Sequence, residues 1–167
     1  MRERAGAGSR PLGSLVPTLV WTLVLAVFFA NVEIQIEGTA GWAAALPTWR
    51  IEKHWLLDIF WGSRPITGYH AWVFPCVALF FHFPLVFMGH FSLRAEARVL
   101  ACIALFWITE DFLWFVFNPA YGLAKFKPEF VPWHVHWWGV APVDYWTFLG
   151  VAGVLFVFSC GPWKGRG

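Results

Sequence analysis

Four long apolar stretches constrain this chain more than any other feature of its sequence. They run over residues 16–32, 71–88, 99–117 and 145–160. Each approaches the length of about 20 residues that an α-helix needs to cross the hydrocarbon core of a bilayer. A transmembrane β-barrel would instead show segments of about 10 residues with alternating polarity, and the sequence contains none. The stretches therefore predict four transmembrane helices.

The composition agrees with this interpretation. Of 167 residues, 59% are hydrophobic and only 13% are charged, whereas soluble domains average roughly 25% charged residues. The 13 Trp and 18 Phe residues suit the aromatic belts of a membrane protein. We therefore expect a single all-α integral membrane domain over residues 1–167, in contact with the lipid bilayer. This composition excludes a disordered tail, a secreted disulfide scaffold and a nucleic-acid-binding module.

The first apolar stretch has two interpretations. Arg2, Arg4 and Arg10 precede it, as basic residues precede the apolar core of a signal peptide. No small-x-small cleavage site follows it, however, because Phe28 stands two residues before Ala30. The sequence therefore favours an uncleaved transmembrane anchor.

Charge bias predicts the orientation of the helices. The two termini and the residues between the second and third stretches, 89–98, carry seven Lys and Arg residues but only two acidic residues. The other connections, counted with the acids inside the helices, carry five basic and eight acidic residues. Because basic residues are enriched on the cytoplasmic side, we expect both termini to be cytoplasmic. The connections over residues 33–70 and 118–144 would then lie outside.

The two outer connections differ in pattern. Residues 49–61 predict an amphipathic helix lying in the membrane interface. Two sets of residues repeat there every four positions, a polar set of Arg50, His54 and Asp58 and an apolar set of Ile51, Trp55 and Ile59. We expect the apolar set to be buried and the polar set to line a site. The connection before the fourth stretch is rich in Pro and aromatic residues, and it predicts a long extended loop.

Glu110 and Asp111 are adjacent acids inside the third apolar stretch. Placing Asp near the centre of a bilayer is unfavourable by about 2.5–3.5 kcal/mol on insertion scales, and such acids usually face a cavity or a partner. On a helix, Asp111 shares a face with Trp114 and Asn118. These residues are candidates for a functional site. The structural alternative is one protonated acid bonded to a neighbouring helix and a second one reaching toward the interface.

His134 and His136 form a His-x-His pattern between Pro and Trp residues. In an extended segment both imidazoles project to the same side. Two imidazoles and a carboxylate suit a divalent metal ion such as Zn, Fe, Mn or Cu. The metal set would be His134 and His136 with Glu110 and Asp111. The alternative is a pair of interfacial histidines packed among Trp rings.

Glu33 and Glu37 follow the first apolar stretch, and His70 precedes the second. Whether they form an i,i+4 pair on a helix or share one face of an extended segment, the two glutamates repel one another unless a cation lies nearby. That cation could be a metal ion, Arg50 or Lys53. We assign Glu33, Glu37 and His70 as candidate acid–base groups. The alternatives are an exposed acidic helix end and a hydrogen-bonded structural histidine.

These residues suggest a small membrane-embedded metalloprotein near the outer leaflet. As an enzyme it would act on an apolar substrate such as a lipid, an isoprenoid or a hydrocarbon, within Trp-rich walls. The alternative is a non-catalytic subunit of a larger membrane complex, in which single histidines bind a pigment or a haem. Association with copies of itself or with other subunits is compatible with both. The sequence contains none of the short motifs of zinc proteases, serine hydrolases or nucleotide-binding proteins.

Overall fold

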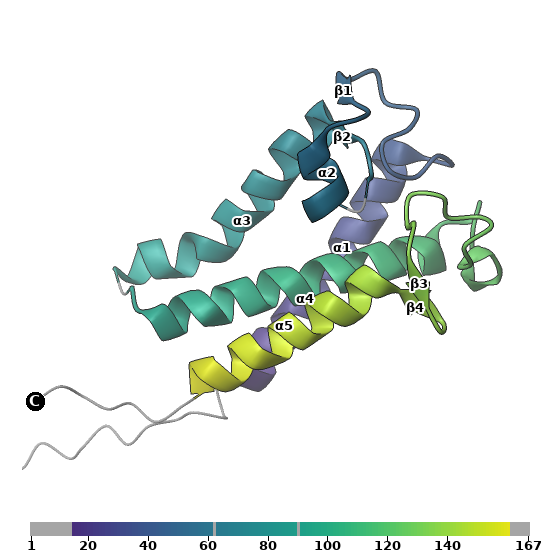
Figure 1. The fold of residues 1–167 in the computed structure, drawn as a ribbon. Coiled ribbons are helices and arrows are strands. Elements are labelled where there is room, and N and C mark those ends of the chain that lie inside the picture. Colours follow the sequence, from purple (N-terminus) through teal and green to yellow (C-terminus); the bar gives the residue numbers. More distant parts are fainter. Residues whose placement is uncertain (1–14, 62, 90, 161–167) are drawn as a thin grey trace, which may run out of the picture.

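The computed structural model describes residues 15–61, 63–89 and 91–160, without the side chains of residues 58–60. It contains four long helices, each long and apolar enough to span a membrane. They are α1 (Leu15–Glu37), α3 (Gly68–Met88), α4 (Leu93–Phe117) and α5 (Val143–Cys160) (Figure 1). The prediction of four long apolar helices is confirmed. The helix α1 continues five residues beyond the predicted end at residue 32.

The bundle is built around α4, which packs against α1 on one side and α5 on another. Ala101 and Ala104 of α4 meet Ala152 of α5, and such small side chains allow two helices to approach closely. The helix α3 meets α4 at the turn after Met88 and diverges from it toward the other end (Figure 1). Pro75 and Pro84 lie inside α3 without ending it, as expected for a membrane helix.

The first connection departs from the predicted helix over residues 49–61. Its strand β1 (Arg50–Ile51) pairs antiparallel with β2 (Ile66–Thr67), and α2 is confined to Trp55–Phe60. The helix starts late because the His54 side chain accepts a hydrogen bond from the backbone N of Leu56 and caps it. Ile51 and Trp55 are 44% and 62% exposed, so the prediction of a buried apolar face is wrong for both. The side chains of Asp58 and Ile59 lie outside the described ones.

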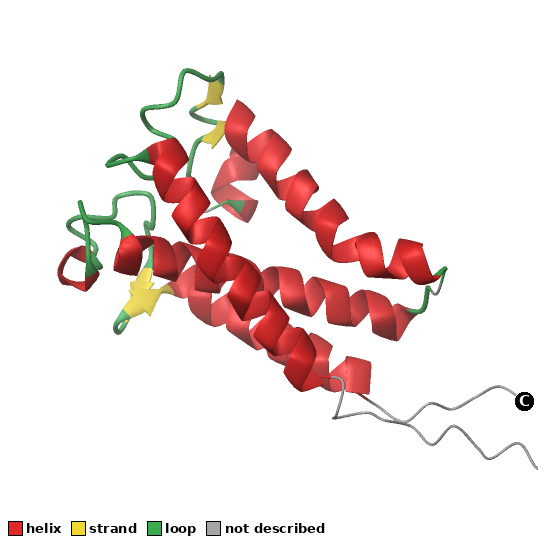
Figure 2. Ribbon diagram, turned by 180° about the vertical axis from the view of Figure 1, so that it is seen from behind, coloured by secondary structure: helices red, strands yellow, loops and turns green. Residues whose placement is uncertain are grey.

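The second connection is mostly irregular, as predicted, but it packs tightly against the bundle (Figure 2). It contains a short 3₁₀ helix, η1 (Leu123–Lys125), and a hairpin of β3 (Trp137–Trp138) and β4 (Ala141–Pro142). Val131 of this connection is fully buried against Trp114 and Phe115 of α4 and Ala30 of α1. We call the end of the bundle that carries both connections the loop end.

Candidate active site at the loop end

A pocket of about 520 Å³ lies between α3, α4 and α5 and reaches the loop end. Its side chains fall into two groups. The apolar half lies deeper along the helices and is lined by Phe74, Pro75, Ala78, Ile103, Ile108 and Phe148. The polar half lies nearer the connections and contains the carboxyl groups of Glu33, Glu37, Glu110, Asp111 and Asp144. A cavity with these two halves suits a molecule that has an apolar body and one polar end.

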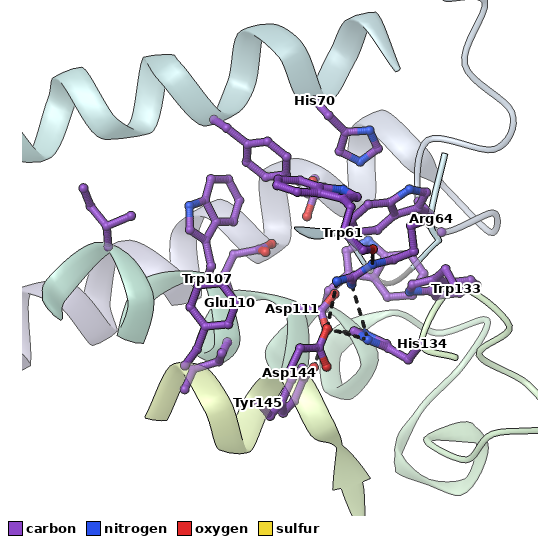
Figure 3. A pocket seen from close by; sticks show the side chains of 18 of the residues that line it. Trp61, Arg64, His70, Trp107, Glu110, Asp111, Trp133, His134, Asp144 and Tyr145 are labelled. Carbon is purple, nitrogen blue, oxygen red and sulfur yellow. Dashed lines mark hydrogen bonds and ion pairs between the residues drawn. The ribbon is translucent and has the colours of Figure 1, made fainter. Parts of the chain in front are cut away.

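A network of charged groups closes one side of the polar half (Figure 3). Nη2 of Arg64 lies 2.9 Å from Oδ2 of Asp144. The same carboxylate oxygen is 3.1 Å from Nδ1 of His134, whose Nε2 is 3.0 Å from Oδ2 of Asp111. The Tyr145 hydroxyl donates a further short hydrogen bond to Asp111. The network therefore joins the first connection, the second connection, α4 and α5.

The network fixes the protonation state of His134. Burial alone would lower the pKa of this imidazole, but the negative charge of Asp111 and the hydrogen bonds to Asp111 and Asp144 outweigh burial. Together they raise the pKa of His134 to about 9. At neutral pH the ring is therefore a cation that donates from both nitrogens. The two cations of the network, Arg64 and His134, are balanced by the two carboxylates.

A second polar group lies apart from this network. The carboxyl groups of Glu33 and Glu110 lie close together, and the Tyr69 hydroxyl donates to Oε1 of Glu33 at 2.8 Å. Two buried carboxyl groups so close together hold at least one proton between them, because two negative charges would repel one another. Glu110 is only 1% exposed, and its Oε1 has no hydrogen-bond partner among the described residues. Figure 3 shows its side chain reaching into the pocket near Trp107, outside the network of dashed lines.

The other predicted acid, Glu37, helps to fold the first connection over the bundle. Its Oε1 accepts a short hydrogen bond from the backbone N of Ala43. Arg50 donates from the opposite direction to the carbonyl oxygens of Ala43, Ala44 and Leu46. Arg50 is thus bound to backbone carbonyls, and it is not among the residues that line the pocket.

An aromatic wall faces the acids across the pocket. The ring centroids of Phe74 lie 4.7 Å from Trp107, 5.3 Å from Trp61 and 5.4 Å from His70. His70 in turn stacks on Trp42 at 4.3 Å, and its Nδ1 lies 2.9 Å from the Thr67 hydroxyl. These five aromatic side chains form one continuous surface.

The structure brings most of the predicted site residues to the pocket. Those that line it are Glu33, Glu37, His70, Glu110, Asp111, Trp114 and His134. Arg50, His54 and Asn118 have structural partners instead. Asn118 donates to the carbonyl of Gly38 at 2.8 Å and so joins the ends of α4 and α1.

The predicted metal set is not assembled in this arrangement. His134 is buried, whereas His136 is exposed, because the backbone turns just before His134, whose N donates to the carbonyl of Val131. Both ring nitrogens of His134 are already bonded to carboxylates. Within residues 15–61, 63–89 and 91–160, no group of three or more His, Cys, Asp or Glu side chains is placed to hold a metal ion.

Sequence reasoning missed Arg64, Asp144 and Tyr145 as parts of the site. A signal was present, since an acid in the membrane needs a partner and Arg64 is one of few basic residues in the two outer connections. Nothing in the local pattern, however, indicates which acid it meets. Comparison with protein-family models, with curated proteins and with solved structures found no match to this chain.

Proposed function

We propose that this chain is a membrane-embedded enzyme that binds an apolar, lipid-like substrate in the pocket. Glu110, paired with Glu33, would give a proton to the substrate and take one back. The observation that carries the proposal is the Oε1 atom of Glu110, which is buried and has no hydrogen-bond partner among the described residues, in a side chain that lines the pocket.

The contrast between the two polar groups supports this assignment. In the network of Arg64, Asp144, His134 and Asp111, opposite charges balance and the side chains bond to one another. A balanced network is suited to holding helices and connections in position. Glu110 differs, because leaving its buried Oε1 atom without a hydrogen-bond partner is unfavourable by about 1–3 kcal/mol. Such a group is expected where a ligand supplies the missing partner.

The proton shared by Glu33 and Glu110 supplies the proposed chemistry. When a substrate atom accepts a proton from Glu110, the negative charge left behind is shared by two neighbouring carboxyl groups. The Tyr69 hydroxyl, which donates to Glu33, stabilises that charge further. The pair returns to its starting state when it takes a proton back, from the same substrate atom in an exchange or from another atom of the substrate in a conversion. A positioned acid–base group of this kind contributes about 10²–10⁴-fold to a rate.

We further propose that the protein resides in a cell membrane with both termini cytoplasmic, which places the loop end on the opposite side. The charge bias of the connections supports this orientation. A substrate dissolved in the bilayer would reach the apolar half of the pocket along the helices.

Incubating the purified protein with a mixed lipid extract in deuterated water tests the proposal. Proton transfer should introduce deuterium into one lipid or convert it into a product, and mass spectrometry detects both outcomes. We expect Glu110→Gln to reduce the rate at least about 100-fold, while the matched change at the exposed Glu52, Glu52→Gln, leaves it unaltered. If the native protein labels and converts no lipid, or if Glu110→Gln is fully active, the proposed function is wrong.

A further inference from the structure

We infer that the substrate binds through an uncharged oxygen group, a hydroxyl or a carbonyl, and that its apolar chain leaves the pocket between α3 and α5. The inference rests on the proposed use of this pocket and adds the chemical class of its ligand.

Three buried polar atoms on side chains that line the pocket have no hydrogen-bond partner among the described residues. They are Oε1 of Glu110 and the indole nitrogens of Trp61 and Trp114. An indole nitrogen can only donate a hydrogen bond. A ligand that satisfies these two groups must therefore carry an acceptor with free lone pairs, which in a lipid is an oxygen atom.

An anionic head group does not fit the charges that line the pocket. An anionic group such as a phosphate or a carboxylate needs an unpaired cation. The positive groups that line the described pocket, Arg64 and His134, are already bound to Asp144 and Asp111. An anion would also lie beside the carboxyl groups of the polar half.

A cationic head group does not fit the pocket either, because it cannot accept hydrogen bonds from the indole N–H groups. An ammonium group could approach Glu110, but it has no lone pair for the indole N–H groups of Trp61 and Trp114. Those two donors would stay buried and unbonded. A hydroxyl or a carbonyl accepts from an indole and also bonds to the carboxyl of Glu110, so a neutral oxygen group satisfies both kinds of partner.

The apolar chain of the ligand has a route out of the pocket between α3 and α5. The apolar half is bounded by Ala78 of α3 and by Phe148 of α5, with Ile103 of α4 between them. The helices α3 and α5 do not pack against each other as α4 and α5 do, and Figure 1 shows α3 diverging from the rest of the bundle. Since both helices are long enough to span a membrane, the side of the pocket between them faces lipid.

Chain-matched photoreactive probes test the head group. Four C16 chains, each with a diazirine in the chain, carry an alcohol, a methyl ketone, a carboxylic acid or an amine, and the full-length protein is held in nanodiscs. We expect the alcohol or the ketone to label peptides of α3 and α5 about tenfold more than the acid or the amine. The preferred member of this pair identifies the oxygen group. Equal labelling by all four probes, or preferential labelling by the acid or the amine, would overturn the inference.

Substitutions test the donors and the route separately. Trp61→Phe and Trp114→Phe should each weaken labelling by the preferred probe several-fold, whereas Trp72→Phe, on an exposed residue that does not line the pocket, should not. Ala78→Trp should block the chain, whereas Leu79→Trp on the exposed neighbour should not. Thermal melting of each variant checks that it is folded. Unchanged labelling in both folded Trp→Phe variants would show that water, rather than a ligand, satisfies these donors.

The two proposals can fail independently. If Glu110→Gln retains turnover while the neutral probes still label selectively, the acid–base role is wrong and the ligand class stands. If turnover depends on Glu110 but the charged probes label best, the ligand class is wrong and the proposed function stands.

Discussion

Nε2 of His134 lies 3.0 Å from Oδ2 of Asp111, and this contact ties the connection between α4 and α5 to α4 itself. The two residues are 23 positions apart in the chain. Because Nδ1 of the same ring contacts Asp144 at 3.1 Å, one buried cation holds acids from two helices. His134 is therefore the residue on which the arrangement of the polar half depends most.

The stability of the protein should fall as the pH rises above neutrality. The pKa of His134 is raised from 6.5 to about 9 in the folded protein, so the folded state holds this proton more tightly than the unfolded state. The resulting stabilisation is complete below about pH 6.5 and is lost as the pH rises through about 9. A rise of this size in the pKa of His134 corresponds to roughly 3 kcal/mol in the free energy of unfolding.

Replacing His134 tests this linkage. His134→Gln should melt at a lower temperature than the native protein at pH 6, and the difference should shrink by pH 9.5. The exposed His136 provides a matched control, since His136→Gln should follow the native pH profile. The test is to measure the melting temperatures of the three proteins in one detergent across this pH range. A difference between His134→Gln and the native protein that does not change with pH would contradict the linkage between His134 protonation and stability.

The Arg64–Asp144 pair should show strong energetic coupling. Arg64 bridges the first connection to α5 at 2.9 Å, and its guanidinium also lies 4.6 Å from the centroid of the Trp42 ring. Either Arg64→Gln or Asp144→Asn leaves a charged partner behind, so each should destabilise the protein by about 1.5–3 kcal/mol. The double variant should lose less stability than the two single variants lose in sum. Strict additivity in a double-mutant cycle would mean that the pair contributes nothing.

The long helices could be predicted because their apolar length has only one structural solution in a bilayer. The structure of residues 49–61 could not be predicted in the same way. The four-residue repeat in this segment is typical of a helix, but its first residues form the strand β1, which pairs with β2. Arg50 pairs with Thr67 across β1 and β2. The local pattern of polar and apolar residues does not indicate a strand partner that lies so far along the chain. The hairpin therefore replaces the first half of the predicted helix.

The candidate site, like the fold, could be predicted only in part. Acids inside apolar helices must find partners, and this rule singled out Glu110 and Asp111, which both line the pocket. The identity of those partners depends on how the connections fold back over the bundle, and this is set by contacts such as Asn118 with Gly38. His134 and His136 separate because a turn, rather than a strand, precedes them.

Gly41 should not tolerate a side chain. A Cβ atom at this position would lie 2.6 Å from two ring carbons of Trp133, a residue that lines the pocket and stacks on Phe115. Gly41→Ala should therefore destabilise the protein by about 1–3 kcal/mol and weaken ligand binding. Gly150→Ala is the control, because its Cβ meets nothing within 4 Å. Equal melting temperatures for the two variants would show that Trp133 can move aside.

Chelation should leave the protein unchanged if protons rather than a metal ion carry its chemistry. Both nitrogens of His134 are bonded to carboxylates, and His136 is exposed. We therefore expect dialysis against EDTA to alter neither the melting temperature nor lipid conversion. If the native protein contains a stoichiometric divalent metal that His134→Gln lacks, the metal site expected from the sequence would be supported instead. A tetrapyrrole band in the absorption spectrum would instead favour a pigment- or haem-binding subunit.

The loop end should lie on the non-cytoplasmic side of the membrane. Single cysteines can be placed at the exposed Ala124 in the second connection and at the exposed Leu93 beside Arg94, in a background without the three native cysteines. A membrane-impermeant maleimide should label Ala124→Cys in intact cells and Leu93→Cys only after the cells are permeabilised.

This expectation follows from the charge distribution, because the cytoplasmic side of a membrane protein retains the excess of Lys and Arg. The loop end holds the polar half of the pocket, so under the proposed function its orientation decides which compartment exchanges protons with Glu33 and Glu110. Labelling of Leu93→Cys alone in intact cells would invert the orientation and open the polar half to the cytoplasm. The geometry of the pocket would be unaffected, but its proton exchange would then follow cytoplasmic pH.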